Sequence, residues 1–254
     1  MLLDQTFPIE GGNLKFDFFA PETDGVLSLV VLIHGGGWIS GDRSMYRDEA
    51  LWLVSQGFSC ACISYRLAPL YPYPAAVADV QAFIRFARQN SAELGIDPQK
   101  IAVLGNSAGG HLAAMAGLCS KSFDPECAAE RANAVVNICG ISDLRNPHVT
   151  HHPISISFLE EFMGGAYQDD EDRWAEASPI TWIKDTPPPM LIFHGTEDDV
   201  VVIDQSRALE RSLTAAGGEV ELVELPGEGH SFTWNSWEKM RTRYTDFLDR
   251  VFSE

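Results

Sequence analysis

Apolar segments alternate with helix-like stretches along most of the chain. Seven segments rich in β-branched and other apolar residues are predicted to be strands: NLKFDFFA (13–20), LSLVVLIH (27–34), SCACISYRL (59–67), KIAVLG (100–105), NAVVNICG (133–140), PMLIFHG (189–195) and EVELVEL (219–225). The later segments are short and continuously apolar, which is typical of parallel strands covered on both faces. The first alternates polar and apolar residues, which indicates antiparallel strands at the edge of the sheet.

Helical patterns lie between these strands. They cover 45–57, 74–95, 108–120, 204–218 and 236–252, and several of them end in glycine, which tolerates the left-handed position after a helix. Strands and helices in alternation predict an α/β fold, a mostly parallel central sheet flanked by helices. The chain of 254 residues is expected to form one domain, 1–254.

One segment, about 145–188, interrupts this alternation. It carries HVTHHP, SFLEEFMGG, DDEDRWAEASP and DTPPP, and it is too long for a simple connection between two strands. We predict a small helical insertion that lies like a lid over one end of the sheet.

The charge of the chain restricts its partners. The net charge is −18 and no basic cluster offsets it, so nucleic acid and anionic membrane surfaces are not expected to bind. Surface acids for solubility explain this charge, with adaptation to salt as the alternative. No segment is long and apolar enough to cross a membrane.

The cysteines and the first residues favour a cytoplasmic protein. Five cysteines, an odd number, lie mostly in apolar surroundings, as reduced core thiols do: Cys60, Cys62, Cys119, Cys127 and Cys139. The opening MLLDQTFPIEGG has an early acid and no basic region before an apolar stretch, unlike a secretory signal.

The stretch GNSAG (105–109) is the first chemical signal. It follows the apolar strand KIAVLG and precedes a helix, which is the context of a nucleophile elbow. Glycines are required there because a Cβ would clash with neighbouring strands, and the positive helix end points at Ser107. The alternative is an ordinary turn in which Ser107 caps the helix.

The second signal is HGGGW (34–38), at the end of the strand LSLVVLIH. Three consecutive glycines cost backbone entropy but expose amide donors to a ligand. In acyl transfer such donors stabilise the oxyanion, and the loss of one typically costs about 10²–10³ in rate. The candidates are the amides of Gly36, Gly37 and Ala108. The alternative is a flexible loop that only turns the chain.

A nucleophilic serine needs a base and an acid that orients the base. His230, in PGEGHSF after the last strand, is the expected base. His34 and His194 end strands and are interpreted as structural, and His111 lies too far along its helix to reach the hydroxyl. His148, His151 and His152 are expected to have surface roles rather than to bind a metal. HGTEDDVV offers three acids, Glu197, Asp198 and Asp199, of which one holds the imidazole.

These motifs together resemble the α/β-hydrolase superfamily. The likeness is to esterases related to hormone-sensitive lipase and to bifunctional feruloyl/acetyl-xylan esterases. It rests on HGGGWISGD (34–42), SYRLAPLYPYPAAVAD (64–79), ELGIDPQKIAVLGNSAGGHLA (93–113), SPITWI (178–183), HGTEDDVV (194–201) and PGEGHSF (226–232). It implies Asp198 as the acid and Gly36, Gly37 and Ala108 as the oxyanion hole. Few residues precede HGGG, so the pocket roof is expected to come from 145–188.

The resemblance implies a serine carboxylesterase with the triad Ser107, Asp198 and His230, and this mechanism requires no metal or other cofactor. A compact lid favours a small pocket, so short acyl esters are the expected substrates. Trp38 and Trp234 are expected to flank the substrate, or else to be packing residues. Arylformamidase or carbohydrate acetyl/feruloyl esterase activity and an inactive hydrolase-fold binding protein are the alternatives, and a homodimer is compatible with the sequence.

Overall fold

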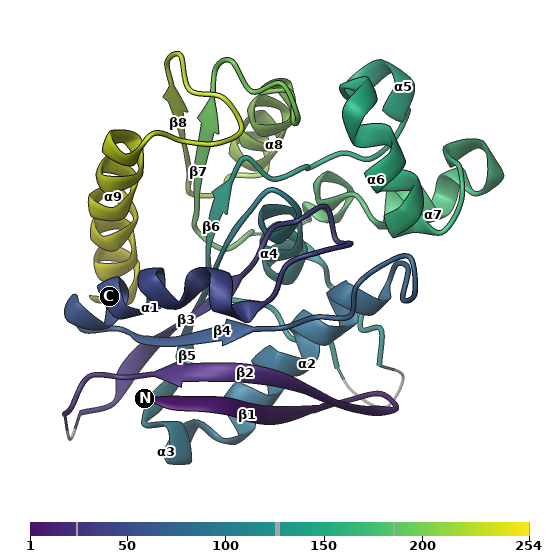
Figure 1. Cartoon of the computed structure of the whole chain (residues 1–254). Coiled ribbons are helices and arrows are strands. Elements are labelled where there is room, and N and C mark those ends of the chain that lie inside the picture. Colours follow the sequence, from purple (N-terminus) through teal and green to yellow (C-terminus); the bar gives the residue numbers. More distant parts are fainter. Residues whose placement is uncertain (24, 125–127, 185, 254) are drawn as a thin grey trace.

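The chain forms one twisted sheet whose strands follow the order β1-β2-β4-β3-β5-β6-β7-β8 (Figure 1). The computed structural model describes residues 1–23, 25–124, 128–184 and 186–253. The eight strands in the described residues are β1 Leu2–Ile9, β2 Gly12–Phe19, β3 Leu27–Ile33, β4 Ser59–Ile63, β5 Ile96–Asn106, β6 Ala134–Ile138, β7 Met190–Gly195 and β8 Val220–Leu225. Pairing is antiparallel from β1 through β2 to β4 and parallel in the other pairs.

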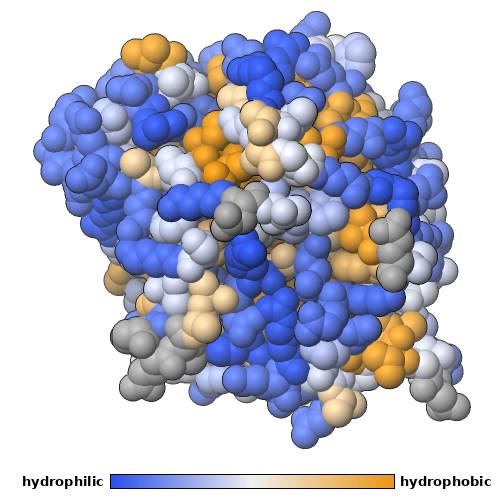
Figure 2. All heavy atoms as spheres, turned by 180° about the vertical axis from the view of Figure 1, so that it is seen from behind, coloured by the Kyte–Doolittle hydropathy of each residue, from blue (hydrophilic) through white to orange (hydrophobic). Residues whose placement is uncertain are grey.

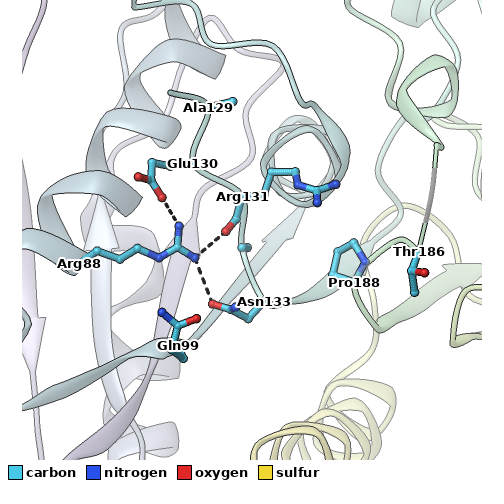
Figure 3. A pocket seen from close by; sticks show the side chains of 9 residues that line it. Arg88, Gln99, Ala129, Glu130, Arg131, Asn133, Thr186 and Pro188 are labelled. Carbon is cyan, nitrogen blue, oxygen red and sulfur yellow. Dashed lines mark hydrogen bonds and ion pairs between the residues drawn. The ribbon is translucent and has the colours of Figure 1, made fainter. Parts of the chain in front are cut away.

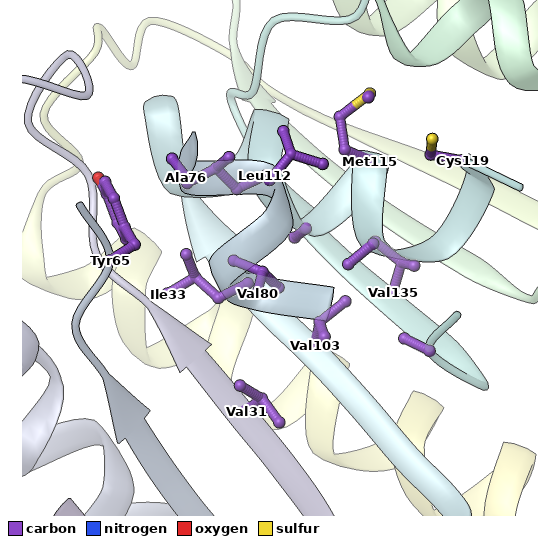
Figure 4. Close-up of a cluster of buried hydrophobic side chains, with 14 of the residues drawn as sticks. Val31, Ile33, Tyr65, Ala76, Val80, Val103, Leu112, Met115, Cys119 and Val135 are labelled. Atoms are coloured by element: carbon purple, nitrogen blue, oxygen red, sulfur yellow. The ribbon is translucent and has the colours of Figure 1, made fainter. Parts of the chain in front are cut away.

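Helices cover both faces of this sheet, because alternate residues of a buried strand point to opposite sides. One face packs against α2 (Ala75–Gln89), α4 (Ala108–Leu118) and α8 (Asp204–Ala215), and the other against α1 (Arg47–Ser55) and α9 (Trp234–Ser253). Figure 4 shows the first face, where side chains from β3, β5 and β6 meet those of α2 and α4. The next residues along the same strands, Val30, Ala102 and Val136, join the core on the other face.

A buried acid joins the two helices of this second face. Glu49 on α1 accepts hydrogen bonds from Trp237 and Tyr244 of α9 and is paired with Arg241 of α9 at 2.8 Å. A buried carboxylate is costly unless it is paired and hydrogen-bonded, and these three partners meet that requirement.

The predicted elements are present, with differences at their ends. The predicted strand 59–67 ends at Ile63, because Arg66 turns away and binds the buried Asp79 through its backbone amide and its guanidinium group. The predicted helix 74–95 is divided into α2 and the short α3 (Ser91–Leu94). The strand β1 was not among the predicted segments, since its pattern is interrupted by polar residues; β2 pairs with it.

The segment 145–188 is helical in its described residues. It holds α5 (Pro147–Thr150), α6 (Pro153–Met163) and α7 (Glu171–Glu176), with short 3₁₀ turns at Tyr167–Asp169 and Pro179–Trp182. These helices lie together beyond the carboxyl end of β6 (Figure 1). The remaining 3₁₀ helix, Arg43–Tyr46, leads into α1.

The cysteines in the described residues are buried thiols, as the sequence predicted. Cys60, Cys62, Cys119 and Cys139 are free and buried, and Cys127 lies outside the described residues. Figure 2 shows one face of the molecule, on which apolar residues form separate patches within a largely hydrophilic surface. None of the described helices has the length and apolarity needed to span a membrane.

Helix α1 offers a matched test of the core. Leu53 is fully buried against the sheet, whereas Leu51 on the same helix is 52% exposed. Leu53→Ala should lower the free energy of unfolding by about 2–5 kcal/mol, because it removes buried methyl groups and leaves a cavity. Leu51→Ala should change it by only about 0.5 kcal/mol. Urea unfolding of both variants measures the difference, and equal losses would contradict this assignment of the core.

Candidate active site

Ser107 lies on a sharp turn between β5 and α4. Its backbone has φ 54° and ψ −121°, a strained conformation for a residue with a side chain. The glycines on either side are required by crowding. A Cβ on Gly105 would lie 2.3 Å from the carbonyl oxygen of Gly109, and one on Gly109 would lie 2.1 Å from that of Ile33. Ser107 occupies the N-cap position of α4, but its side chain makes no capping hydrogen bond to the helix.

Three side chains from distant parts of the chain meet above this turn. His230 Nε2 lies 3.0 Å from Ser107 Oγ, and His230 Nδ1 lies 2.8 Å from Asp198 Oδ2. The second carboxylate oxygen of Asp198 accepts hydrogen bonds from the amides of Val200 at 2.9 Å and Val201 at 2.8 Å. The structure thus brings together the serine, acid and base that the sequence predicted, and Asp199, the neighbouring acid, is exposed.

The loops that carry the acid and the base are bonded to each other. The loop after β7 donates from the amide of Glu197 to the carbonyl of Glu228 at 2.9 Å, and Thr196 Oγ1 accepts from the amide of Gly227 at 2.9 Å. Glu228 in turn accepts from Thr233 at 2.8 Å. These bonds fix the position of His230 relative to Asp198.

The electrostatics of the pair favour an ionised acid beside a basic imidazole. Burial raises the pKa of Asp198, but hydrogen bonds from His194, His230 and Val200 outweigh it, so that pKa lies well below its usual range. Burial lowers the pKa of His230, but Asp198 and the nearby Cys139 side chain raise it above its usual range. An ionised Asp198 orients the ring so that Nδ1 donates to the carboxylate and Nε2 faces the hydroxyl as an acceptor.

Free amide groups lie beside the hydroxyl. Gly36 and Gly37 follow β3 with φ of 110° and 60°, and Ala108 is the first residue of α4. Among the described residues no acceptor is bonded to the amides of Gly36 and Gly37, and the first amides of a helix lack intrahelical partners. The positive end of α4 adds to the attraction for an anion at this place.

A cavity of about 440 Å³ opens at the hydroxyl. Its walls come from the elbow, the glycine loop, the His230 loop and the lid helix α6: Gly36, Gly37, Trp38, Ser40, Asn106, Ser107, Ile141, Ile154, Ser155, Phe158, Val200, Val201, His230 and Ser231. Phe158 of α6 lies directly over Gly37, where a Cβ would be 2.8 Å from its ring. The lid therefore forms part of the roof of this cavity.

The two predicted substrate-binding tryptophans lie in different surroundings. Trp38 is 2% exposed, stacks on Phe162 with ring centres 4.4 Å apart, and donates to His111 Nδ1 at 3.2 Å. Trp234 is 64% exposed and lines a neighbouring cavity of about 350 Å³ rather than the one at Ser107. Asn106 lines both cavities and accepts a hydrogen bond from Tyr46 at 3.0 Å.

Four of the other histidines are buried and have structural partners, whereas His148 is exposed and His152 is half-buried. His34 is stacked on Tyr65, His111 is bonded to the carbonyl of Ala177 at 2.8 Å, and His194 is bonded to Ser206 and to the carbonyl of Val201. The expectation of a surface role is wrong for His151, which is buried and whose Nε2 lies 2.9 Å from the carbonyl oxygen of Asp143.

In the described residues another cavity lies at the amino ends of the parallel strands, away from Ser107. It surrounds Arg88, Asn133 and Pro188, near the amino ends of β6 and β7 (Figure 3). Arg88 is bonded there to Glu130, to the carbonyl of Arg131 and to Asn133. These bonds join α2 to the segment before β6, so Arg88 is interpreted as structural.

The sequence reasoning missed several residues at the site. Ile154 and Phe158 were not identified because the lid pattern does not say which helix face points inward. Cys139 was not considered as a neighbour of the triad. Its side chain lies close to both Asp198 and His230. The signal was available, because Cys139 follows a parallel strand and the carboxyl ends of such strands meet at one edge.

Comparison with known proteins shows a family match and similarity to several esterases. The model of the BD-FAE family matches residues 16–213. Esterase LipC of Mycobacterium tuberculosis is 36% identical over 80% of this chain and 53% of its own length, and esterase LipQ of the same organism is 35% identical over 88% and 55%. The chain thus spans about half the length of these relatives. The propionate-bound structure of esterase Est2 from Thermogutta terrifontis has a TM-score of 0.82 at 27% identity, covering 98% of this chain and 93% of that one.

The pairing of acid and base can be tested without a substrate. Nuclear magnetic resonance titration should place the pKa of the His230 imidazole above its usual value near 6.5. Asp198→Asn should lower this pKa, because the negative partner that favours the imidazolium is lost while burial remains. Asp199→Asn, at the adjacent exposed position, should leave it nearly unchanged. A larger shift in Asp199→Asn would show that the acid has been wrongly assigned.

Proposed function

Since the chain belongs to the BD-FAE family and has the α/β-hydrolase fold, we propose that it is a serine carboxylesterase that hydrolyses short-chain acyl esters. The family and the fold were both predicted from the sequence, and both are confirmed. The observation that carries the proposal is the continuous contact from Asp198 through His230 to Ser107, at 2.8 and 3.0 Å. The esterase names of LipC and LipQ support the reaction class.

In the proposed acylation step Ser107 Oγ attacks the ester carbonyl while its proton passes to His230 Nε2. Asp198 stabilises the imidazolium that forms and holds the ring in the required tautomer. The amides of Gly36, Gly37 and Ala108 bind the negative oxygen of the tetrahedral intermediate. The intermediate collapses to an acyl-enzyme, and His230 returns its proton to the departing alcohol.

In the proposed deacylation step water takes the place of the alcohol. His230 Nε2 accepts a proton from this water as its oxygen attacks the acyl-enzyme carbonyl. The same amides bind the oxyanion a second time, and the proton goes back to Ser107 Oγ as the acid leaves. Every proton transfer in this cycle uses groups of the chain and water, and we propose no cofactor.

The acyl group is proposed to bind in the cavity at Ser107. Ile141, Ile154 and Phe158 give its wall apolar contacts, each worth roughly 0.8 kcal/mol per buried methylene. Phe158 lies close over the glycine loop and limits the depth of the cavity. The preference for short chains is supported by these contacts and by the propionate bound to Thermogutta terrifontis Est2.

The tryptophans are proposed to act on different parts of the substrate. Trp38 is held by Phe162 and His111 and forms a fixed wall of the acyl cavity. Trp234 is exposed beside the second cavity, which suits the alcohol portion of the ester. The BD-FAE match and this exposed ring favour a carbohydrate acetyl or feruloyl ester as the second candidate substrate.

The proposal also covers the domain organisation, the location and the oligomeric state of the protein. We infer a single catalytic domain, 1–254, whose lid is 145–188, acting on a small-molecule ester. A cytoplasmic location is supported by the four buried, unpaired thiols, which suit a reducing compartment. A homodimer stays a prediction.

Ser107→Ala should lower kcat for p-nitrophenyl acetate by about 10⁴–10⁶-fold, because the nucleophile is lost while the fold is kept. In the wild type kcat/KM should rise with pH, with a midpoint above 6.5, because His230 must be neutral to act as a base and its pKa is raised. Stopped assays from pH 5 to 10 measure both effects. Equal, buffer-level rates for the two proteins would favour the inactive binding protein instead.

Phe158→Ala should shift acyl preference toward longer chains. The deletion deepens the cavity, and two further buried methylenes are worth about 1.6 kcal/mol, or roughly 15-fold in kcat/KM. The ratio of octanoyl to butyryl p-nitrophenyl ester hydrolysis measures this shift. Val149→Ala on the same lid, at an 86% exposed position outside the cavity, is the matched control and should leave the ratio unchanged. An unchanged ratio in Phe158→Ala would place the acyl group elsewhere.

A further inference from the structure

Behind the His230 ring lies a cluster of three metal-binding side-chain types. One donor atom each from Cys139, Asp198 and His230 lies within 4.8 Å of the other two. Within the described residues this is the only group of three or more His, Cys, Asp and Glu side chains with that spacing. The three residues follow β6, β7 and β8, so the adjacent ends of parallel strands bring them together.

Cys139 takes no part in the proposed esterase cycle. Its thiol is free and its side chain fully buried, with no route to the ester carbonyl. The backbone holds it in place: its amide donates to the carbonyl of Phe193 at 2.8 Å, and its φ of 44° lies in the left-handed region that residues with a side chain seldom adopt. The sulfur is therefore fixed against the acid and the base.

We propose that Cys139, Asp198 and His230 form a binding site for a thiophilic divalent cation such as Zn²⁺. Binding of the cation at this site inhibits the enzyme. The inhibitory half of this proposal rests on the proposed esterase function, whereas the binding half does not. Zinc takes thiolate, imidazole and carboxylate ligands at about 2.0–2.3 Å in tetrahedral geometry. Three protein ligands leave the fourth position to water.

For the nitrogen–oxygen pair the required adjustment is small, and the Cys139 sulfur, which lies within 4.8 Å of both, moves toward them. Nitrogen and oxygen ligands of a tetrahedral zinc ion lie roughly 3.3 Å apart, as follows from their bond lengths. His230 Nδ1 and Asp198 Oδ2 lie 2.8 Å apart while a proton is between them. A separation of about 0.5 Å, by rotation of the two side chains, admits the ion in place of that proton.

Inhibition follows from the balance of protons. The ion binds the lone pair on Nδ1 of a neutral imidazole, so the ring's single proton moves from Nδ1 to Nε2. The Cys139 thiol releases its proton to solvent and binds as a thiolate. Nε2–H is then a donor toward Ser107 and cannot accept the hydroxyl proton. No bond between heavy atoms of the protein is broken, and a chelator that removes the ion lets both protons return and restores the active tautomer.

Access is through the active-site cavity. The His230 side chain is 20% exposed and lines that cavity, and Asp198 and Cys139 lie behind it. An ion enters as the ring turns away from Ser107. Magnesium and calcium prefer oxygen ligands, so a site with one thiolate and one imidazole discriminates against them.

The first experiment titrates p-nitrophenyl acetate hydrolysis with Zn²⁺ and, in parallel, with Mg²⁺. We expect Zn²⁺ alone to suppress the wild-type rate, and EDTA to restore it. Cys139→Ala and Cys139→Ser should raise the Zn²⁺ concentration at half inhibition by about 10–100-fold, each relative to its own uninhibited rate. Cys119→Ala removes another buried thiol and should behave as the wild type. Equal Zn²⁺ midpoints in wild type and both Cys139 variants would overturn the proposal.

A second experiment does not depend on catalysis. Co²⁺ added to the Ser107→Ala protein should give the near-ultraviolet absorption of a cobalt–thiolate bond, and Ser107→Ala/Cys139→Ser should lack it. If the wild type hydrolyses no ester but this band appears, the binding site stands and the proposed function fails. If esters are hydrolysed but the band is absent or survives in the double variant, the site is refuted. Circular dichroism of each variant confirms that it is folded.

Discussion

The approach of α4 to the ends of β3 and β5 is the constraint on which the site depends. Gly109 lies so close to Ile33 that a single added carbon would meet its carbonyl oxygen. Ile33 is the last residue of β3, and the glycine loop begins two residues later. The same close packing therefore positions Ser107, the amides of the glycine loop and the positive end of α4 as one unit. Larger residues at these positions would separate Ser107 from those amides.

Asp198 and His230 lie on the loops that follow β7 and β8, two strands that are neighbours in the sheet. β7 and β8 run parallel, so their following loops emerge side by side and bond to each other through Glu197 and Glu228. Asp198 is fixed by the amides of Val200 and Val201, and it fixes His230 in turn. The order in which Ser107, Asp198 and His230 lie along the sheet thus follows from the order of the strands. Hydrogen bonds between the loops set the distances between the side chains.

Much of this was predictable from the sequence, since buried parallel strands are continuously apolar and the elbow and glycine loop have local signatures. Local pattern could not identify β1, whose polar residues obscure its alternation, nor the end of β4 at Ile63, which depends on the distant Asp79. The same limit applies to the cavity. Tertiary packing brings Phe158 against Gly37 and places Trp234 in the lining of a neighbouring cavity, and no short stretch of sequence encodes that packing.

The lid has one further consequence. Residues 145–188 leave the sheet after β6 and return at β7, two strands that are hydrogen-bonded neighbours. Because these strands run parallel, the segment starts at the carboxyl end of β6 and finishes at the amino end of β7, one strand length away, and the entropy of closing a longer or shorter connection changes only slowly with length. A change in the length or sequence of this segment therefore need not move Ser107, Asp198 or His230. We expect the roof of the cavity to be adjustable separately from the three side chains that meet at the elbow.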